Sequence, residues 1–266
     1  MATLPRSIAR LAAIALVLLA GCANVVTVPD PSAVRGLAPT GSLRVGLYPG
    51  TPTSIIGNPA SGSAKGVGFD LGRALTKRAG VAFVPVVFAN NAEVFAAAKS
   101  GAVDMVFTNA SPARMKELDF SPTVLQVEQG YLVPAGSPIR DIAEVDRPGV
   151  RLGVSEGSTS ESTLSRELRN ATIVRTASLD AAVDLLANGK LDAFATNKAI
   201  LFEMSDRIPG SRVLAGRYGL EGLAVGIPKG REAAMPLIRS FVADAWASGE
   251  VRQAVERAEL RGTVLP

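Results

Sequence analysis

Apolar and polar positions alternate with two different periods in the first half of the chain. Residues 43–47 alternate as a strand does, whereas residues 68–79 carry apolar positions at the spacing of one helix face and end before Gly80. We predict strands at 43–47, 81–88 and 102–107, helices at 68–79 and 93–99, and a longer extended stretch at 125–134. Strands and helices in turn are typical of a mainly parallel sheet that helices cover on both faces.

The second half of the chain repeats this order. Residues 191–196 (LDAFAT) match residues 103–108 (VDMVFT) in their pattern of apolar positions, aspartate and threonine. We predict strands at 151–154, 172–175, 191–196 and 223–227, and helices at 179–187 and 231–257, the latter interrupted at Gly249. The repetition predicts an α/β fold of two lobes. Because open α/β sheets bind ligands beyond the carboxyl ends of their strands, we expect the site in the cleft between the lobes.

The best candidate for binding chemistry is the stretch 103–114. Its strand ends in polar residues including Asn109, after which Ser111 is a typical N-cap and Pro112 a typical first helical residue. A helix N-terminus offers free backbone N–H groups, and Arg114 adds a guanidinium that can bind a carboxylate through two hydrogen bonds. The stretch predicts an anion site. The alternative is that Arg114 is a solvated arginine on an ordinary capped helix.

A second candidate is the turn at residues 157–160, which joins a predicted strand to a predicted helix. Its small hydroxyl side chains Ser158, Thr159 and Ser160 and its free N–H groups can face an anion across the cleft from Arg114. The alternative is that Ser158 or Ser160 does no more than cap the helix.

The composition excludes most enzyme classes. The 266 residues include no histidine and one cysteine, which excludes Ser-His-Asp and Cys-His catalysis, zinc sites with the usual ligands, and an internal disulfide. The net charge is +4, but lysines and arginines are scattered and do not interleave with aromatics. We therefore expect no cofactor, no metal and no nucleic-acid partner.

The N-terminal residues have the order of a secretory signal. Arg6 and Arg10 precede an apolar run at 11–20, which is too short to span a bilayer comfortably, and Cys22 follows. Residues 19–22 (LAGC) resemble the bacterial lipobox, in which the cysteine becomes a lipid-modified N-terminus. We predict a lipoprotein signal at 1–22, lipidation at Cys22 and a flexible tether at 23–41, so that the mature chain is anchored outside the cytoplasm, in the periplasm or on the cell surface. The alternative is an ordinary buried cysteine after a cleaved signal.

Several stretches, in this order, resemble the extracytoplasmic solute-binding proteins of ABC importers, in the class that carries polar amino acids. The resemblance spans nearly the whole mature chain. Its pieces are residues 43–46 (LRVG), 65–72 (KGVGFDLG), 99–104 (KSGAVD), 111–114 (SPAR), 119–121 (DFS), 152–159 (LGVSEGST), 188–193 (NGKLDA) and 226–230 (GIPKG).

The resemblance implies a two-lobed periplasmic-binding-protein fold with one lobe at 42–126, a second at 127–227 and a return to the first at 228–266. It implies that Arg114 binds the carboxylate of a small solute, helped by Asn109 and, from the second lobe, by the Thr159 hydroxyl. The implied partners are this solute and the membrane subunits of an ABC permease, and we expect a monomer.

The chain departs from the family pattern where the ligand would be recognised. The position that matches the family's ammonium-binding aspartate is Asn197, and the two usual aromatic positions match Thr51 and, approximately, Asn91. Tyr48 is a possible replacement aromatic or an ordinary core or surface residue. The pocket is therefore expected to be rich in amides and to favour acidic or neutral-tailed carboxylates over common amino acids.

Two other functions stay open. Some relatives of the fold are cyclohexadienyl dehydratases, in which a lysine and a glutamate transfer protons, and the candidate acids in this chain are Glu161 and Asp70. Each lies near a predicted helix start, where a negative charge favours the helix dipole. The third function is a sensor that reports ligand to a membrane protein.

Overall fold

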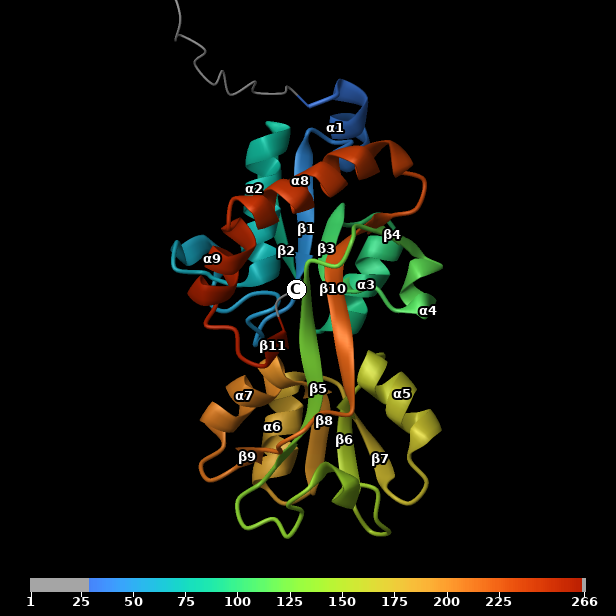
Figure 1. Ribbon diagram of the computed structural model, residues 1–266, viewed down its shortest axis with the longest axis vertical. Helices are drawn as coiled ribbons and strands as arrows, with labels where there is room; N and C mark the ends of the chain where they lie inside the picture. The colour runs from blue at the N-terminus through green and yellow to red at the C-terminus, as the bar shows by residue number, and fades with distance from the viewer. Residues whose placement is uncertain (1–28, 265–266) are drawn as a thin grey trace, which may run out of the picture.

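The computed structural model describes residues 29–264, in which one twisted sheet passes through two lobes (Figure 1). The strand order is β2-β1-β3-β10-β5-β8-β6-β7, with β4 beside β10 and with β9 and β11 beside β5. The strands are β1 (Ser42–Leu47), β2 (Ala82–Val87), β3 (Met105–Asn109), β4 (Leu118–Phe120), β5 (Leu125–Val133), β6 (Arg151–Ser155), β7 (Thr172–Thr176), β8 (Ala193–Asn197), β9 (Arg212–Val213), β10 (Gly219–Pro228) and β11 (Thr263–Val264). The α-helices are α1 (Pro31–Leu37), α2 (Val67–Ala79), α3 (Asn91–Lys99), α4 (Pro112–Met115), α5 (Thr159–Glu167), α6 (Leu179–Ala187), α7 (Lys198–Arg207), α8 (Met235–Ala247) and α9 (Glu250–Arg257), and short 3-10 turns lie at Pro59–Ser61, Ile142–Glu144 and Glu232–Ala234.

Each lobe contains three parallel strands. In the first lobe β1 is parallel to both β2 and β3, and in the second lobe β6 is parallel to both β7 and β8. Two antiparallel strands, β5 and β10, pair with each other and join the two sets (Figure 1). The predicted α/β fold of two mainly parallel lobes flanked by helices is confirmed.

The two long strands decide where one lobe ends and the other begins. β10 pairs with β5 over Gly219–Leu223 and then with β3 over Leu223–Gly226, so the chain re-enters the first lobe inside this strand. The predicted boundaries at 126/127 and 227/228 therefore fall within continuous strands. The return of the chain to the first lobe was predicted at residue 228, whereas β10 already pairs with β3 from Leu223. The prediction was late because only the apolar second half of β10 has a clear strand pattern.

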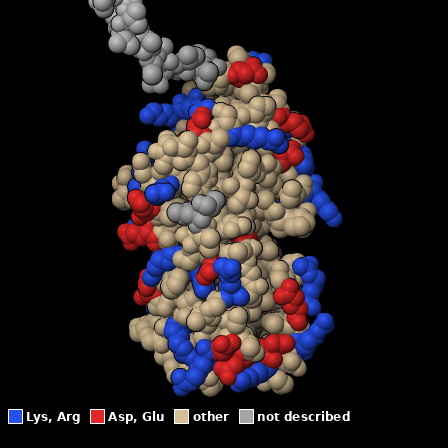
Figure 2. Space-filling model, viewed as in Figure 1, with Lys and Arg blue, Asp and Glu red and all other residues tan. Residues whose placement is uncertain are grey.

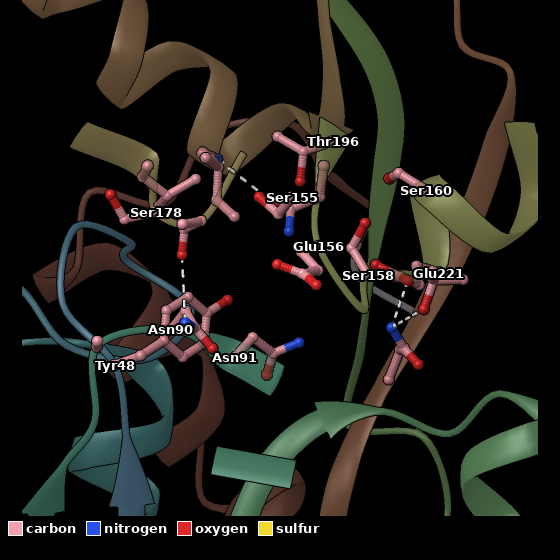
Figure 3. A pocket seen from close by; sticks show the side chains of 17 residues that line it. Tyr48, Asn90, Asn91, Ser155, Glu156, Ser158, Ser160, Ser178, Thr196 and Glu221 are labelled. Carbon is pink, nitrogen blue, oxygen red and sulfur yellow. Dashed lines mark hydrogen bonds between the residues drawn. The ribbon is translucent and has the colours of Figure 1, made fainter. Parts of the chain in front are cut away.

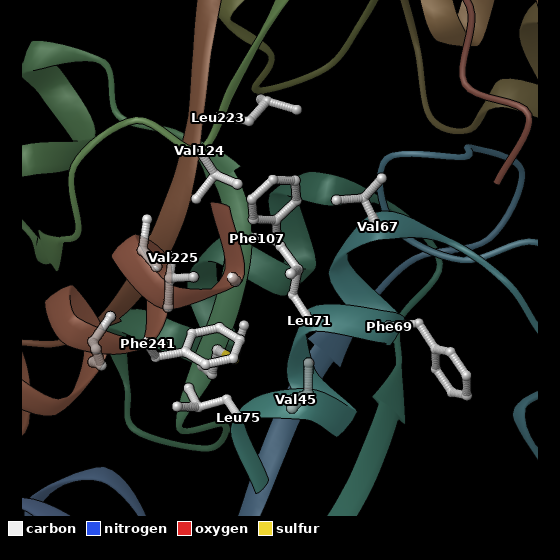
Figure 4. Packing of buried hydrophobic residues seen from close by; sticks show 14 of the residues in the cluster. Val45, Val67, Phe69, Leu71, Leu75, Phe107, Val124, Leu223, Val225 and Phe241 are labelled. Carbon is white, nitrogen blue, oxygen red and sulfur yellow. The ribbon is translucent and has the colours of Figure 1, made fainter. Parts of the chain in front are cut away.

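A large apolar core lies between the first-lobe sheet and helices α2 and α8. Figure 4 shows Val45 and Phe107 of the sheet facing Leu71 and Leu75 of α2, with Phe241 of α8 beside them. All five are buried, and the core continues into α9. Residues 235–257 form two helices that break at Gly249, which has φ +79°, so the predicted interruption is confirmed. The C-terminal helices therefore complete the first lobe.

The predicted flexible tether is wrong for residues 31–37. Asp30 caps α1 by accepting a 3.1 Å hydrogen bond from the Ser32 backbone N–H, and a proline occupies the first turn. Ala33 and Leu37 are buried in the core that includes α8, and Leu37 has no exposed surface. Because α1 has just two core positions, its apolar period was too short to detect in the sequence.

In each lobe an aspartate lies directly before the strand that carries the internal repeat. Asp104 accepts hydrogen bonds from the Arg44 backbone N–H at 2.9 Å and from its Nε and Nη2 at 2.8 and 2.7 Å. Asp192 binds the corresponding three donors of Arg151 at 2.7, 2.8 and 2.8 Å. β3 and β8 consequently begin at Met105 and Ala193, later than predicted. The two lobes thus share this arrangement as well as their strand order.

The predictions of a signal at 1–22, of lipidation at Cys22 and of a tether at 23–28 concern residues outside the described range. Among helices within 29–264, none has the length and apolar character needed to cross a bilayer. Acidic and basic side chains are intermixed over the face shown in Figure 2.

Candidate functional site

A cavity of about 60 Å³ lies between the lobes, where strands of both lobes end. β1, β2 and β3 lead to Tyr48, Asn90 and Asn109 on one side. On the other side β6 is followed by Thr159 at the start of α5, and β8 ends at Asn197. Figure 3 shows side chains from both lobes directed into this space. The other lining residues are Ala89, Asn91, Ser155, Glu156, Ser158, Ser160, Ala177, Ser178, Leu179, Thr196, Ile200 and Glu221. The predicted location of a site beyond the strand ends thus coincides with a cavity rich in amides and hydroxyls.

Two hydrogen bonds cross the cleft and hold the lobes together. Asn109 Nδ2 donates to Thr159 Oγ1 at 2.6 Å, which links the end of β3 to the start of α5. Asn90 Nδ2 donates to the backbone carbonyl of Ala177 at 3.2 Å. Two residues predicted to bind the ligand, Asn109 and Thr159, therefore contact each other directly in this closed arrangement.

Glu221, on the part of β10 that was not predicted, is a site residue that no sequence pattern identified. Asn109 Nδ2 also donates to Glu221 Oε1, and Gln129 Nε2 on β5 donates to Glu221 Oε2 at 2.7 Å. Figure 3 shows the Glu221 carboxylate beside Ser158 and Ser160. A single acid within the run 219–227 (GLEGLAVGI) was the available signal, because a lone carboxylate in an otherwise apolar strand needs a local reason.

Burial raises the pKa of the Glu221 carboxyl. The positive charge of Arg114 and hydrogen bonds from Thr159, Gln129 and Asn109 oppose this shift but do not cancel it. Two hydroxyl groups hold the side chain of Gln129, which in turn donates to the Glu221 carboxylate. Tyr218 Oη donates to Ser160 Oγ at 2.8 Å, and Ser160 Oγ donates to Gln129 Oε1 at 3.1 Å. The amide of Gln129 is thereby oriented toward Glu221.

Arg114 is buried but does not line the 60 Å³ cavity. Its Nη1 donates to Thr108 Oγ1 at 2.5 Å, and its guanidinium carbon lies 5.3 Å from the centre of the Phe95 ring. It lines a second hollow of about 590 Å³ that also contacts Ser158 and Thr159. Burial lowers the pKa of Arg114, and the charge of Glu221 opposes this effect. The alternative that Arg114 is a solvated surface arginine is wrong.

Three of the predicted polar residues are helix caps. Ser111 Oγ accepts from the Arg114 backbone N–H at 3.4 Å, Ser158 Oγ from the Glu161 N–H at 3.0 Å, and Asn197 Oδ1 from the Ile200 N–H at 3.1 Å. Ser111 lies by the second hollow, whereas Ser158 and Asn197 also line the cavity. The cap role of Asn197 leaves its amide nitrogen available to a ligand. The cap at Ser111 was predicted from the sequence, a cap at Ser158 or Ser160 was the alternative to a binding role, and the cap at Asn197 was not predicted.

Of the residues considered for the two aromatic positions, Tyr48 and Asn91 line the cavity and Thr51 does not. Tyr48 lines the cavity together with Asn91, and burial raises its pKa to about 12. Thr51 is fully buried, hydrogen-bonds to Thr53 at 2.9 Å and does not line the cavity. Thr51 is thus a buried residue of the loop that follows Tyr48.

The two candidate catalytic acids both lie away from the cavity. Glu161 accepts a 2.7 Å hydrogen bond from the Gly157 N–H and pairs with Arg175, and Asp70 pairs with Arg257 at 3.0 Å. Neither lines the cavity, in which the acids are Glu156 and Glu221. Over residues 29–264 no group of three or more acidic or cysteine side chains is placed to hold a metal ion.

Comparison with known proteins gives a family and several similar structures. Residues 43–258 match the model of the bacterial extracellular solute-binding proteins, family 3. The glutamine-binding protein GlnH of a Bacillus subtilis (strain 168) ABC transporter is 25% identical over 192 residues, which cover 69% of each chain.

Two solved structures are similar in fold. An ancestral arginine-binding protein bound to glutamine superimposes with a TM-score of 0.74 at 22% identity, covering 84% of this chain and 98% of its own. The ancestral amino acid-binding protein AncCDT-1, a precursor of cyclohexadienyl dehydratase, gives a TM-score of 0.73 at 23% identity, covering 84% of this chain and 97% of its own.

Proposed function

This chain belongs to the bacterial extracellular solute-binding proteins, family 3, and from that membership and the closed cleft we propose that it is the substrate-binding component of an amino-acid ABC importer. It captures a small carboxylate-bearing solute, an amino acid or a close analogue, between its lobes and delivers it to a membrane permease. The observation that carries the proposal is the cavity, which residues from the strand ends of both lobes line and which the Asn109–Thr159 hydrogen bond closes. A ligand in this position stabilises the closed form by contacting both lobes.

Arg114 and Thr159 are the proposed carboxylate-binding pair. Thr159 lies at the start of α5, where backbone N–H groups are free, and both residues line the 590 Å³ hollow. Thr159, which accepts the hydrogen bond from Asn109, lines both this hollow and the smaller cavity. In the smaller cavity Tyr48, Asn91 and Asn197 are the proposed contacts for the rest of the solute. A solute that reaches both spaces replaces that bond with its own contacts.

The proposal is tested first by native mass spectrometry of protein purified without refolding. A co-purified solute gives an additional mass that disappears after mild denaturation and dialysis. Calorimetric titration of the dialysed protein with the twenty amino acids and with simple dicarboxylates then measures specificity. A chain that binds none of these compounds would contradict the proposal.

Membrane attachment through a lipid on Cys22, followed by a short linker, is part of the proposal. Labelled palmitate should be incorporated into the wild-type chain in a bacterial host and be absent from the Cys22→Ser variant. Equal labelling of both would place the modification elsewhere, and no labelling would favour an ordinary cleaved signal.

Dehydration of a cyclohexadienyl acid is the second candidate, and its support is the similarity to AncCDT-1. The candidate acids for proton transfer, Glu161 and Asp70, lie outside the cavity and have arginine partners. We therefore favour binding without turnover. An assay with prephenate and arogenate separates the two functions, and turnover that a Glu161→Gln variant loses while it still binds would establish the enzyme.

A sensor that uses the same cleft differs from an importer in its membrane partner alone.

A further inference from the structure

The cavity between the lobes contains negative charge without positive charge. Glu156 and Glu221 line it, and its lining includes no lysine or arginine among residues 29–264. Arg114 influences Glu221 through its charge, but no N–O distance between a basic side chain and Glu221 is 4 Å or less in the described part of the chain. The charges in the cleft are therefore separated. The carboxylate of Glu221 lines the cavity, and the guanidinium of Arg114 lines the 590 Å³ hollow.

Two other carboxylates in or next to this sheet are neutralised by ion pairs with nearby side chains. Asp104 pairs with Arg44 at 2.7 Å and with Arg231 at 2.6 Å. Glu128, on β5, pairs with Lys198 at 2.6 Å and with Arg217 at 3.0 Å. Each of these acids has two cations, as expected for a partly buried charge with a structural role. Glu221 has neutral donors instead, so its negative charge remains available to a ligand.

The residue that orients Glu221 also has an unfilled acceptor. Asn109 is 6% exposed, and its Oδ1 atom is buried without a hydrogen-bond partner. The amide orientation is fixed, because Nδ2 donates to Thr159 and to the Glu221 carboxylate. A buried carbonyl oxygen without a donor is unfavourable in the free protein. The Asn109–Glu221 pair thus offers both negative charge and an unsatisfied acceptor in the closed cleft.

We infer that Glu221 selects the charge of the solute and binds an ammonium or guanidinium group that the solute presents in the cavity. The inference rests on the proposed function and adds a residue of β10, one of the two strands that join the lobes, to the recognition of the ligand. It reverses the preference for acidic or neutral-tailed carboxylates that the neutral Asn197 predicted. The positive group is either the α-ammonium or a side-chain cation, and both share the chemistry that a buried carboxylate recognises.

Calorimetric titration with four matched probes tests the inference. L-arginine has both cations, L-citrulline keeps the α-ammonium alone, 5-guanidinopentanoate keeps the guanidinium alone, and glutarate has neither. The proteins are the wild type, Glu221→Gln, and Glu221→Asp, which keeps the charge. The matched control is Glu128→Gln, because this carboxylate lies on the paired strand β5 and has its own cations.

We expect L-arginine to bind the wild type at least about tenfold more tightly than glutarate. Glu221→Gln should lose about 10- to 100-fold in affinity for L-arginine and should bind glutarate no more weakly than the wild type does. Glu128→Gln should match the wild type, and Glu221→Asp should retain the preference for cations. Of L-citrulline and 5-guanidinopentanoate, the probe that loses more affinity in Glu221→Gln identifies which positive group binds Glu221. L-arginine affinity within about twofold of wild type in a folded Glu221→Gln protein would overturn the inference while the proposed function stands. Absence of binding by any of the four probes to the wild type would overturn the inference, whereas the proposed function fails when the twenty amino acids and the simple dicarboxylates also do not bind.

Discussion

Asn109 on the first lobe donates a 2.6 Å hydrogen bond to Thr159 on the second, and this contact closes the cleft. Thr159→Val removes the hydroxyl and keeps the side-chain shape, so the closed form should lose about 0.5–1.5 kcal/mol. We expect a larger radius of gyration in small-angle X-ray scattering without ligand, and weaker solute binding. Thr172→Val, an exposed position on β7 of the same lobe, is the control. An unchanged radius would mean that other contacts hold the lobes together.

Arg114→Ala should reduce affinity for carboxylate-bearing solutes by about 2–5 kcal/mol, because the ligand anion would be buried without its partner. Calorimetric titration measures the loss. Arg239→Ala removes the same charge from an exposed position on α8 and should bind as the wild type does. The unfolding midpoints of both variants are needed, since Arg114 also contacts Thr108 and Phe95. Equal solute affinity of the Arg114→Ala and Arg239→Ala variants would mean that Arg114 does not bind the solute.

Asn197→Asp should improve affinity for amino acids and weaken binding of simple anions such as glutarate, because it adds a negative charge to the cavity lining. The substitution keeps the cap of α7, since aspartate caps as well as asparagine does. Asn188→Asp, at the exposed C-terminal end of α6, is the matched control. Titrations with L-glutamine and glutarate distinguish the outcomes, and equal changes for both ligands would contradict a charge effect.

The raised pKa of Glu221 predicts a pH dependence of stability without ligand. A carboxyl whose pKa is higher in the folded state binds more protons folded than unfolded between the two values. This group therefore stabilises the protein as pH falls through its folded pKa toward the unfolded value near 4.5. Glu221→Gln should be more stable than the wild type at neutral pH, and the difference should shrink as pH falls toward that value. Urea unfolding from pH 8 to pH 5 measures both, and a constant difference would mean that the carboxyl is not destabilised by burial.

Helix α1 should contribute measurably to stability. Leu37 is fully buried against the first-lobe core, so Leu37→Ala should lower the free energy of unfolding by about 2–5 kcal/mol. Arg35→Ala, on the exposed face of the same helix, should change it by less than about 0.5 kcal/mol. A chain that starts at residue 38 should be less stable than one that starts at residue 29. Urea denaturation of all four proteins, compared with the parent chain, tests whether α1 belongs to the fold.

The sequence by itself determined most of the strands and helices and their grouping into lobes, because apolar periodicity is local and each strand-helix pair repeats it, but α1 and α7 were not predicted. The repeat at residues 103–108 and 191–196 indicated two similar lobes, and the SPAR stretch identified Ser111 as a cap and Arg114 as a binding candidate. Tertiary structure decided which side chains meet. Glu221 and Asn109 are 112 positions apart, and antiparallel pairing of β10 with β3 brings them together. No local pattern in the sequence predicts this contact, since it depends on how β5 and β10 cross from one lobe to the other. The packing of α1 was likewise decided by a distant helix, α8, which supplies the apolar surface that two buried residues alone could not predict.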